Sequence, residues 1–235
     1  MRGRRVFLFL YMASGAAALV YEVVWTRLLT LQLGHTVAAA STVLAAFMGG
    51  LASGAWIAGR VLRRRTGRDS SGPTTCLRVY AGLEIGIALF AFLLPSALHA
   101  FGSVLAWAYA DGTAPARFAI VRVGISLAVL GVPTAAMGAT FPIAAQWWAE
   151  TELAAARSAA DAGMLYGANT AGAALGAIAA GFFLIPSIGL RATTWIGVAL
   201  NLLAAGGAFW LAAQLTRNAE AAKAAKTFFL LSPSL

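Results

Sequence analysis

The sequence VFLFLYMASGAAALVYEVVWTRLLTLQL, residues 6–33, is long enough and apolar enough to cross a membrane as one helix. A transmembrane helix needs about 20 mostly apolar residues, and this stretch exceeds that length. The rest of the chain has the same character, because 60% of its 235 residues are hydrophobic and only 11% are charged. A soluble domain of this size could not bury so much apolar surface. The sequence therefore predicts an all-α, polytopic membrane protein.

Five further apolar stretches predict membrane-spanning helices, which makes six in all. The expected spans are residues 6–33, 37–62, 79–99, 118–146, 163–185 and 192–214. The polar segment RRRTGRDSSGPTT at 63–75 is a predicted loop, since it combines charge with Ser, Gly and Pro. We expect one transmembrane domain at 1–215 and a short, frayed cytoplasmic tail at 216–235.

Two stretches are expected to depart from a straight spanning helix. Pro133 and Pro142 lie inside the fourth span and predict a kinked or broken helix. Residues 99–117 are too short to cross the bilayer. Their aromatic residues Trp107 and Tyr109 predict an interfacial turn or short helix, because Trp and Tyr gather at the headgroup level.

Basic residues are distributed unevenly among the polar segments. Most of the 17 Lys and Arg residues fall at the N-terminus, around 60–78 and in the tail after 216. Segments rich in Lys and Arg stay on the cytoplasmic side of a membrane, so we predict that both termini are cytoplasmic. The same distribution accounts for the formal charge of +9. Because the basic residues have no aromatic interleaving, we expect no nucleic-acid partner.

Catalytic and metal-binding signatures are missing from the sequence. It has no Gly-rich nucleotide loop after a strand, no H-E-x-x-H and no G-x-S-x-G. Cys76 is the lone cysteine, and the two histidines, His35 and His99, lie at span ends. We therefore expect no catalytic residue, no metal and no cofactor in this chain.

Three spans carry stripes of small residues at helical spacing. The stripe residues are Gly15 and Ala18 in the first span, Gly50 and Gly54 in the second, and Gly172, Gly176 and Ala180 in the fifth. Small residues let helix backbones approach closely in lipid, where apolar burial does not drive association. We favour packing within one bundle as the interpretation, and a dimer interface is the alternative.

Two charged residues lie inside the first span. Glu22 is within a few ångströms of the midplane, because the span 6–33 has its middle near residue 20. An ionised carboxylate at that depth costs at least ~2.5 kcal/mol, so Glu22 is expected to face protein or water. Arg27 lies about 140° around the helix from Glu22 and nearer the outer end. We therefore do not expect these two residues to pair.

Other spans contribute further candidate residues to an intramembrane polar site. Glu84 lies about one and a half turns into the third span, where a carboxylate snorkelled to the interface is the alternative interpretation. Arg122 in the fourth span is a possible counter-ion for Glu22 or Glu84. Asn169, and more weakly Asn201, are expected to form hydrogen bonds across helices.

Four stretches carry a family resemblance. They are SGAAALVYEVVWTRLL, GGLASGAWIAGR, VPTAAMGATFPI and LYGANTAGAALGAIAAGFFLIPSIGLRAT. They resemble the membrane region of bacterial spermidine-synthase-like proteins, which are fusions of a major-facilitator-like module with a polyamine aminopropyltransferase domain. The resemblance implies six helices in a half-major-facilitator-like bundle in the bacterial inner membrane. Residues at family-pattern positions are Tyr21, Glu22, Arg27, Glu84, Met137, Gly138, Pro142, Tyr166 and Asn169.

The synthase domain of that family is not expected in this chain. Only 20 residues follow Leu215, and they contain no Gly- and Asp-rich loop of the kind that binds decarboxylated S-adenosylmethionine. We therefore do not expect the chain to synthesise spermidine by itself.

Three functional hypotheses follow. The first, favoured by packing motifs beside absent catalytic ones, is a non-enzymatic membrane module that serves as anchor, scaffold or subunit of a larger complex. The second is a carrier or binder of a small cation such as a polyamine, as a homodimer, in which Glu22 neutralises the amine with support from Glu84. The third is the membrane part of an aminopropyltransferase system whose catalytic domain is on another chain. Expected partners are the lipid bilayer and either other membrane subunits or a second copy.

Overall fold

The protein is all-helical in a computed structural model that describes residues 2–33, 36–65, 72–109, 112–113, 115–150 and 158–231. The elements are α1 (Arg2–Leu33), α2 (Val37–Arg65), α3 (Pro73–Ala100), α4 (Gly102–Tyr109), α5 (Pro115–Glu150), α6 (Ser158–Ile178), the π-helix η3 (Ala179–Leu184) and α7 (Ile185–Leu231). These described residues contain no strand, which confirms the predicted all-α fold class. Parts of the segment between the first two predicted spans, residues 34–36, and of the predicted loop at 63–75 lie outside the described residues.

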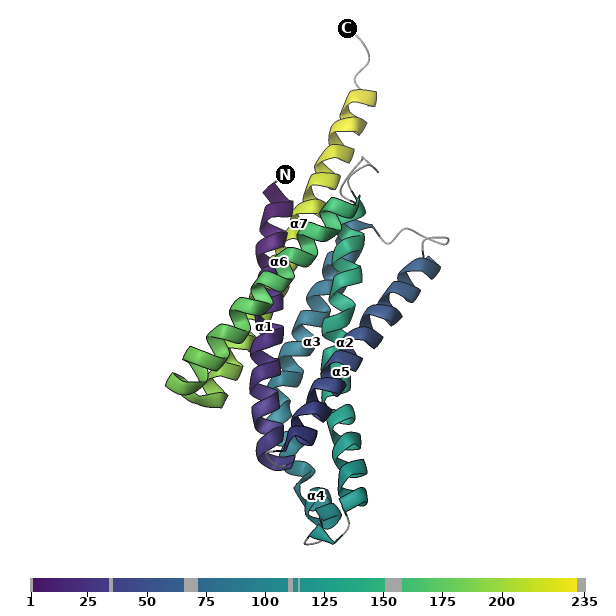
Figure 1. Ribbon diagram of the computed structural model, residues 1–235. Helices are drawn as coiled ribbons and strands as arrows, with labels where there is room; N and C mark the ends of the chain where they lie inside the picture. Colours follow the sequence, from purple (N-terminus) through teal and green to yellow (C-terminus); the bar gives the residue numbers. More distant parts are fainter. Residues whose placement is uncertain are drawn as a thin grey trace.

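In the described part of the chain, five helical stretches are long and apolar enough to cross a membrane. Four of them match the first four predicted spans, and the fifth, Ala162–Thr227, contains both remaining ones. Its two arms form a hairpin in Figure 1, where the chain runs down α6 and returns along α7. Gly189 lies at the reversal with φ 78° and ψ 173°, a conformation that favours glycine. Both termini lie at the same end of the molecule (Figure 1).

Three expectations for individual segments can be compared with the structure. The predicted short helix in 99–117 is present as α4. Of the two outcomes predicted for the fourth span, a kink or a break, the break is not found, because α5 is one continuous helix through Pro133 and Pro142. Without competing water in the bilayer, a helix tolerates proline where neighbouring helices and hydroxyl groups support it. The frayed tail is also wrong as far as Leu231, since α7 continues to that residue through an alanine-rich sequence that favours helix.

The helices pack in specific pairs. α1 packs against α6 and α7, α2 against α5, and α3 against α5 and α7. The small-residue stripes lie at these contacts. A Cβ on Gly54 would come within 1.8 Å of the carbonyl oxygen of Ala135, and one on Gly172 within 1.9 Å of that of Met12. The remaining stripe residues contact helices of the same chain as well: Gly15 faces Asn169, Gly50 faces Thr134, Gly176 faces Ala16, Ala180 is fully buried and Ala18 packs against the core.

The α1–α6 and α2–α5 contacts are related by an internal repeat. The sequence GGLASGAWIAG at 49–59 and the sequence AGAALGAIAAG at 171–181 are identical at six of eleven positions. Within them Gly50 contacts α5 at Thr134, and its counterpart Gly172 contacts α1 at Met12. The second helix of each half therefore packs against the first helix of the other half. This is the pattern of two three-helix repeats related by a pseudo-two-fold axis.

We predict that Gly172→Ala destabilises the protein by about 1–3 kcal/mol, because the added methyl group overpacks the α1–α6 contact. The measurement is equilibrium unfolding in mixed micelles. Gly86→Ala is the matched control, since nothing lies within 4 Å of its Cβ position, and its effect is expected to stay within about 0.5 kcal/mol. Equal effects of the two substitutions would contradict the packing interpretation.

Candidate functional site

Glu84 of α3 is fully buried between α1 and α7, with 0% of its surface exposed. The Ser14 hydroxyl of α1 donates a hydrogen bond to Oε1 at 2.5 Å, and the Asn201 amide of α7 donates to Oε2. The Tyr80 hydroxyl, one turn earlier on α3, lies beside Ser14 and Glu84 but is oriented without a hydrogen bond. One carboxyl group therefore links three helices through neutral partners.

The depth of Glu84 differs from the sequence-based expectation. The third span was expected to begin at residue 79, which would place Glu84 near the interface. The helix begins at Pro73, since proline fits the first turn of a helix. Glu84 is therefore about three turns inside α3 and is not a snorkelled carboxylate.

A cavity of about 300 Å³ adjoins this carboxyl group. Ser14 and Asn201, the two hydrogen-bond donors to Glu84, both line it. Its other polar lining residues are Tyr11, Thr140, Tyr166 and Asn169. Asn201 is only 2% exposed, and its Oδ1 is buried without a hydrogen-bond partner. A side chain that lines the cavity thus holds an unused acceptor next to a buried carboxyl group, and a ligand that donates hydrogen bonds would suit that acceptor.

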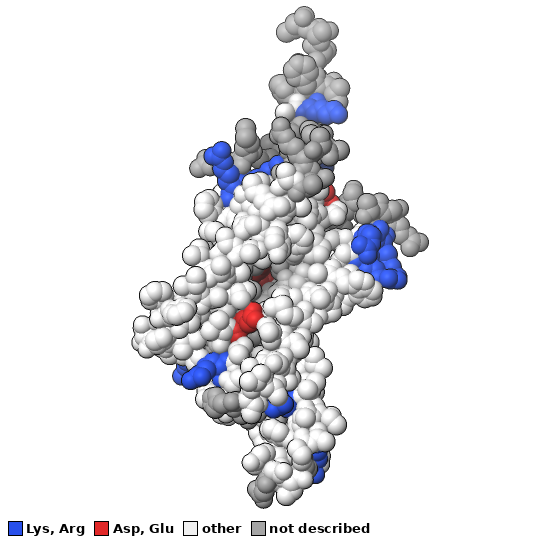
Figure 2. Space-filling view, viewed as in Figure 1, with Lys and Arg blue, Asp and Glu red and all other residues white. Residues whose placement is uncertain are grey.

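Two predicted site residues, Tyr166 and Asn169, line the cavity, and Glu84 lies directly behind it. Glu22 is elsewhere. It lies two turns along α1 from Ser14, a rise of about 12 Å, and is partly exposed, with Oε2 buried and unpaired. Figure 2 shows acidic atoms midway along the face in view, with Lys or Arg atoms just below them and further basic atoms towards the upper end.

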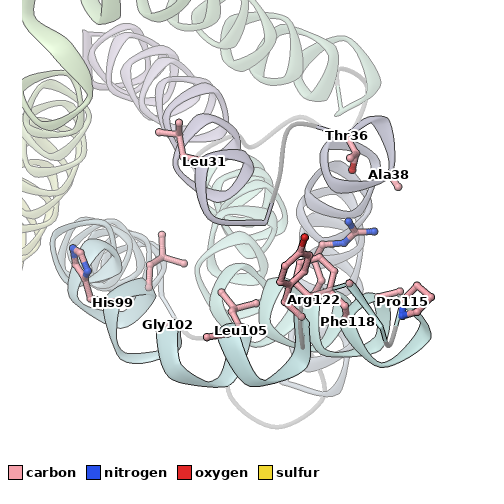
Figure 3. Close-up of a pocket in the computed structure, with 14 residues that line it drawn as sticks. Leu31, Thr36, Ala38, His99, Gly102, Leu105, Pro115, Phe118 and Arg122 are labelled. Carbon is pink, nitrogen blue, oxygen red and sulfur yellow. The ribbon is translucent and has the colours of Figure 1, made fainter.

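Arg122 is separate from both carboxylates. It lines a different cavity at the end of the bundle that carries α4, and its guanidinium carbon is 5.7 Å from the centre of the Phe118 ring (Figure 3). Within the described part of the chain it forms no ion pair with Glu22 or Glu84. The predicted counter-ion role of Arg122 is therefore not found in the structure.

Sequence reasoning missed Ser14, Tyr11 and Thr140 as members of the site. Each is a single hydroxyl in an apolar helix, so no motif marks it. Hydroxyl groups at mid-membrane depth usually form hydrogen bonds across helices, and that property is the signal that could have found them. The described residues contain no group of three His, Cys, Asp or Glu side chains placed to hold a metal ion.

Comparisons with protein-family models, curated proteins and solved structures found no match to this chain. The resemblance to the membrane region of spermidine-synthase-like proteins stays a prediction. The chemistry of the site is accordingly argued from its own residues: a buried carboxyl group, a free amide oxygen and a cavity of ligand size.

We predict that Glu84 and Asn201 are energetically coupled by about 0.6–1.7 kcal/mol, the range of interhelical hydrogen bonds in membranes. The measurement is a double-mutant cycle of Glu84→Ala and Asn201→Ala, by unfolding in mixed micelles. Glu22→Ala combined with Asn201→Ala is the control, and it is expected to be additive because Glu22 forms no hydrogen bond with Asn201. Additive effects in both cycles would contradict a direct hydrogen bond between Glu84 and Asn201.

Proposed function

We propose that the chain is a non-enzymatic membrane module that binds a small cation with amine groups, such as a polyamine, in the cavity beside Glu84. The observation that carries the proposal is the buried Oδ1 of Asn201, which has no partner and belongs to a side chain that lines the cavity, next to a carboxyl group without a cationic partner in the described structure. An ammonium group could donate a hydrogen bond to that oxygen and provide the missing positive charge.

The electrostatics of the site favour a cation over a neutral ligand. An ionised carboxylate at membrane depth is costly unless an opposite charge compensates it. In the described structure, Ser14 and Asn201 donate hydrogen bonds to Glu84 and the Tyr80 hydroxyl lies beside it, and all three groups are neutral. An ionised Glu84 would attract a cation in the cavity across one layer of side chains, where the low dielectric strengthens attraction. The resemblance to spermidine-synthase-like membrane regions adds polyamines as the first ligand class to test.

A second candidate function is a subunit that packs against another membrane protein. The α6–α7 hairpin favours it, because only 11% of the most apolar window in Ala162–Thr227 is buried, against 33–44% in the other four spans. Large apolar side chains of this hairpin, including Phe182 and Phe183, are exposed. A protein partner would cover these side chains. If lipid alone covered them, the chain would be isolated without a protein partner.

For the amine site, we predict that Glu84→Gln weakens binding of radiolabelled spermidine by tenfold or more, because the substitution removes the negative charge beside the cavity. Binding is measured on the purified protein in nanodiscs. Glu22→Gln is the matched control, since it removes a second carboxylate of the membrane-spanning helices that has no hydrogen bond to a residue lining the cavity, and it is expected to bind like the wild type. Spermidine binding that is unchanged by Glu84→Gln would overturn the proposal.

For the subunit function, we predict that a photo-crosslinker at Phe182 captures a membrane protein in cells. The same probe at Ala144, which is fully buried, is the control and is expected to capture nothing. Mass spectrometry of the natively purified protein checks the result. A chain that is always recovered alone would remove this candidate and leave the amine site unaffected.

A further inference from the structure

A second and larger cavity, of about 850 Å³, lies at the end of the bundle opposite the termini. It is bounded by the ends of α1 and α3, the start of α2, α4 and the start of α5 (Figure 3). Most of its wall is apolar, with Leu31, Leu98, Leu105 and Phe118 among the lining residues. We call it the Arg122 cavity, after the one described Lys or Arg side chain in its wall.

Among the described residues, the Nε of Arg122 has no acceptor in this cavity. Its Nε is buried and has no hydrogen-bond partner, and no described carboxylate pairs with it. Arg117, one helical turn away, differs: it donates to the backbone oxygens of Trp107 at 3.0 Å and Ala108 at 3.4 Å. A buried guanidinium N–H without an acceptor carries the full penalty of desolvation. The arrangement therefore fits an anion that supplies the missing acceptor.

The start of α2 adds a second positive feature to the same cavity. Thr36 and Ala38 line the cavity, and Figure 3 shows the Arg122 side chain reaching towards them. Thr36 caps the helix by accepting from the N–H of Ala39 through Oγ1 at 3.1 Å. The N-terminus of a helix carries a partial positive charge and favours phosphate groups. Arg122 and α2 thus direct positive potential into one space.

The position of the cavity indicates where the anion comes from. Trp107 and Tyr109 of α4 are 61% and 53% exposed beside it, as expected for aromatic residues at the headgroup level. The apolar wall suits glycerol and the first carbons of acyl chains, and Arg122 suits the phosphate. We propose that the Arg122 cavity binds the phosphate group of an anionic phospholipid. Soluble phosphate shares this chemistry and is the other source of the ligand. This proposal does not depend on the amine site.

Native mass spectrometry of the purified protein tests the proposal with phosphatidylglycerol and with diacylglycerol, which has the same chains but no phosphate. We expect phosphatidylglycerol to stay bound and diacylglycerol to dissociate. Arg122→Gln is expected to weaken phosphatidylglycerol binding by tenfold or more, because a charge-assisted hydrogen bond is lost. Arg27→Gln, an exposed arginine of α1, is the matched control and should bind as the wild type does.

Two further arms keep the result interpretable. Arg122→Lys retains the charge and is expected to recover most of the binding, which separates recognition of the phosphate from a folding defect. If inorganic phosphate competes with phosphatidylglycerol for the cavity, the ligand is soluble phosphate. If it does not compete, the ligand is the lipid. Both results support a phosphate site. Equal binding of the two lipids, or equal effects of Arg122→Gln and Arg27→Gln, would overturn the proposal.

Discussion

The hydrogen bonds of the Glu84 carboxyl group fix the relative depth of three helices. Glu84 has no exposed surface, so groups of the protein must satisfy the carboxyl oxygens. Ser14 and Asn201 are 70 and 117 positions away in sequence, and both must reach the same side chain. A shift of α1 or α7 by one turn, about 5.4 Å, would break one of the bonds. These hydrogen bonds therefore set the register of α1, α3 and α7. In a lipid environment, apolar burial alone does not set it.

Close backbone contacts between helix pairs hold the remaining long helices in the bundle. Gly172 of α6 lies against α1, and Gly54 of α2 lies against α5. Since helices gain little from apolar contact in lipid, such contacts depend on dispersion between closely spaced backbones. A methyl group at either glycine would force the pair apart. The repeated glycine pattern thus places α2 and α6 in equivalent positions, while the two copies of the third helix, α3 and α7, meet at Glu84 and Asn201.

Local sequence properties predict the spans, and they do not predict how the polar side chains pair. The presence and approximate positions of the long apolar helices follow from apolar length, which is a property of each stretch alone. The start of α3 was missed because its first turns, including Arg78, are polar, and that error moved Glu84 to the interface. Arg122 was assigned to a carboxylate because no sequence pattern tells which helices are neighbours. The repeat between 49–59 and 171–181 does carry that information, since it predicts equivalent helix contacts in the two halves.

A structural role explains only part of the geometry around Glu84. A purely structural link between helices needs donors that satisfy the carboxyl oxygens, and the Ser14 hydroxyl and the Asn201 N–H groups are such donors. It does not need an amide, because a second hydroxyl could donate as well. The amide brings an additional acceptor, and that oxygen is buried without a partner in a side chain that lines the cavity. A buried polar group without a partner is a penalty for folding. A ligand with an N–H donor removes that penalty, and packing alone does not.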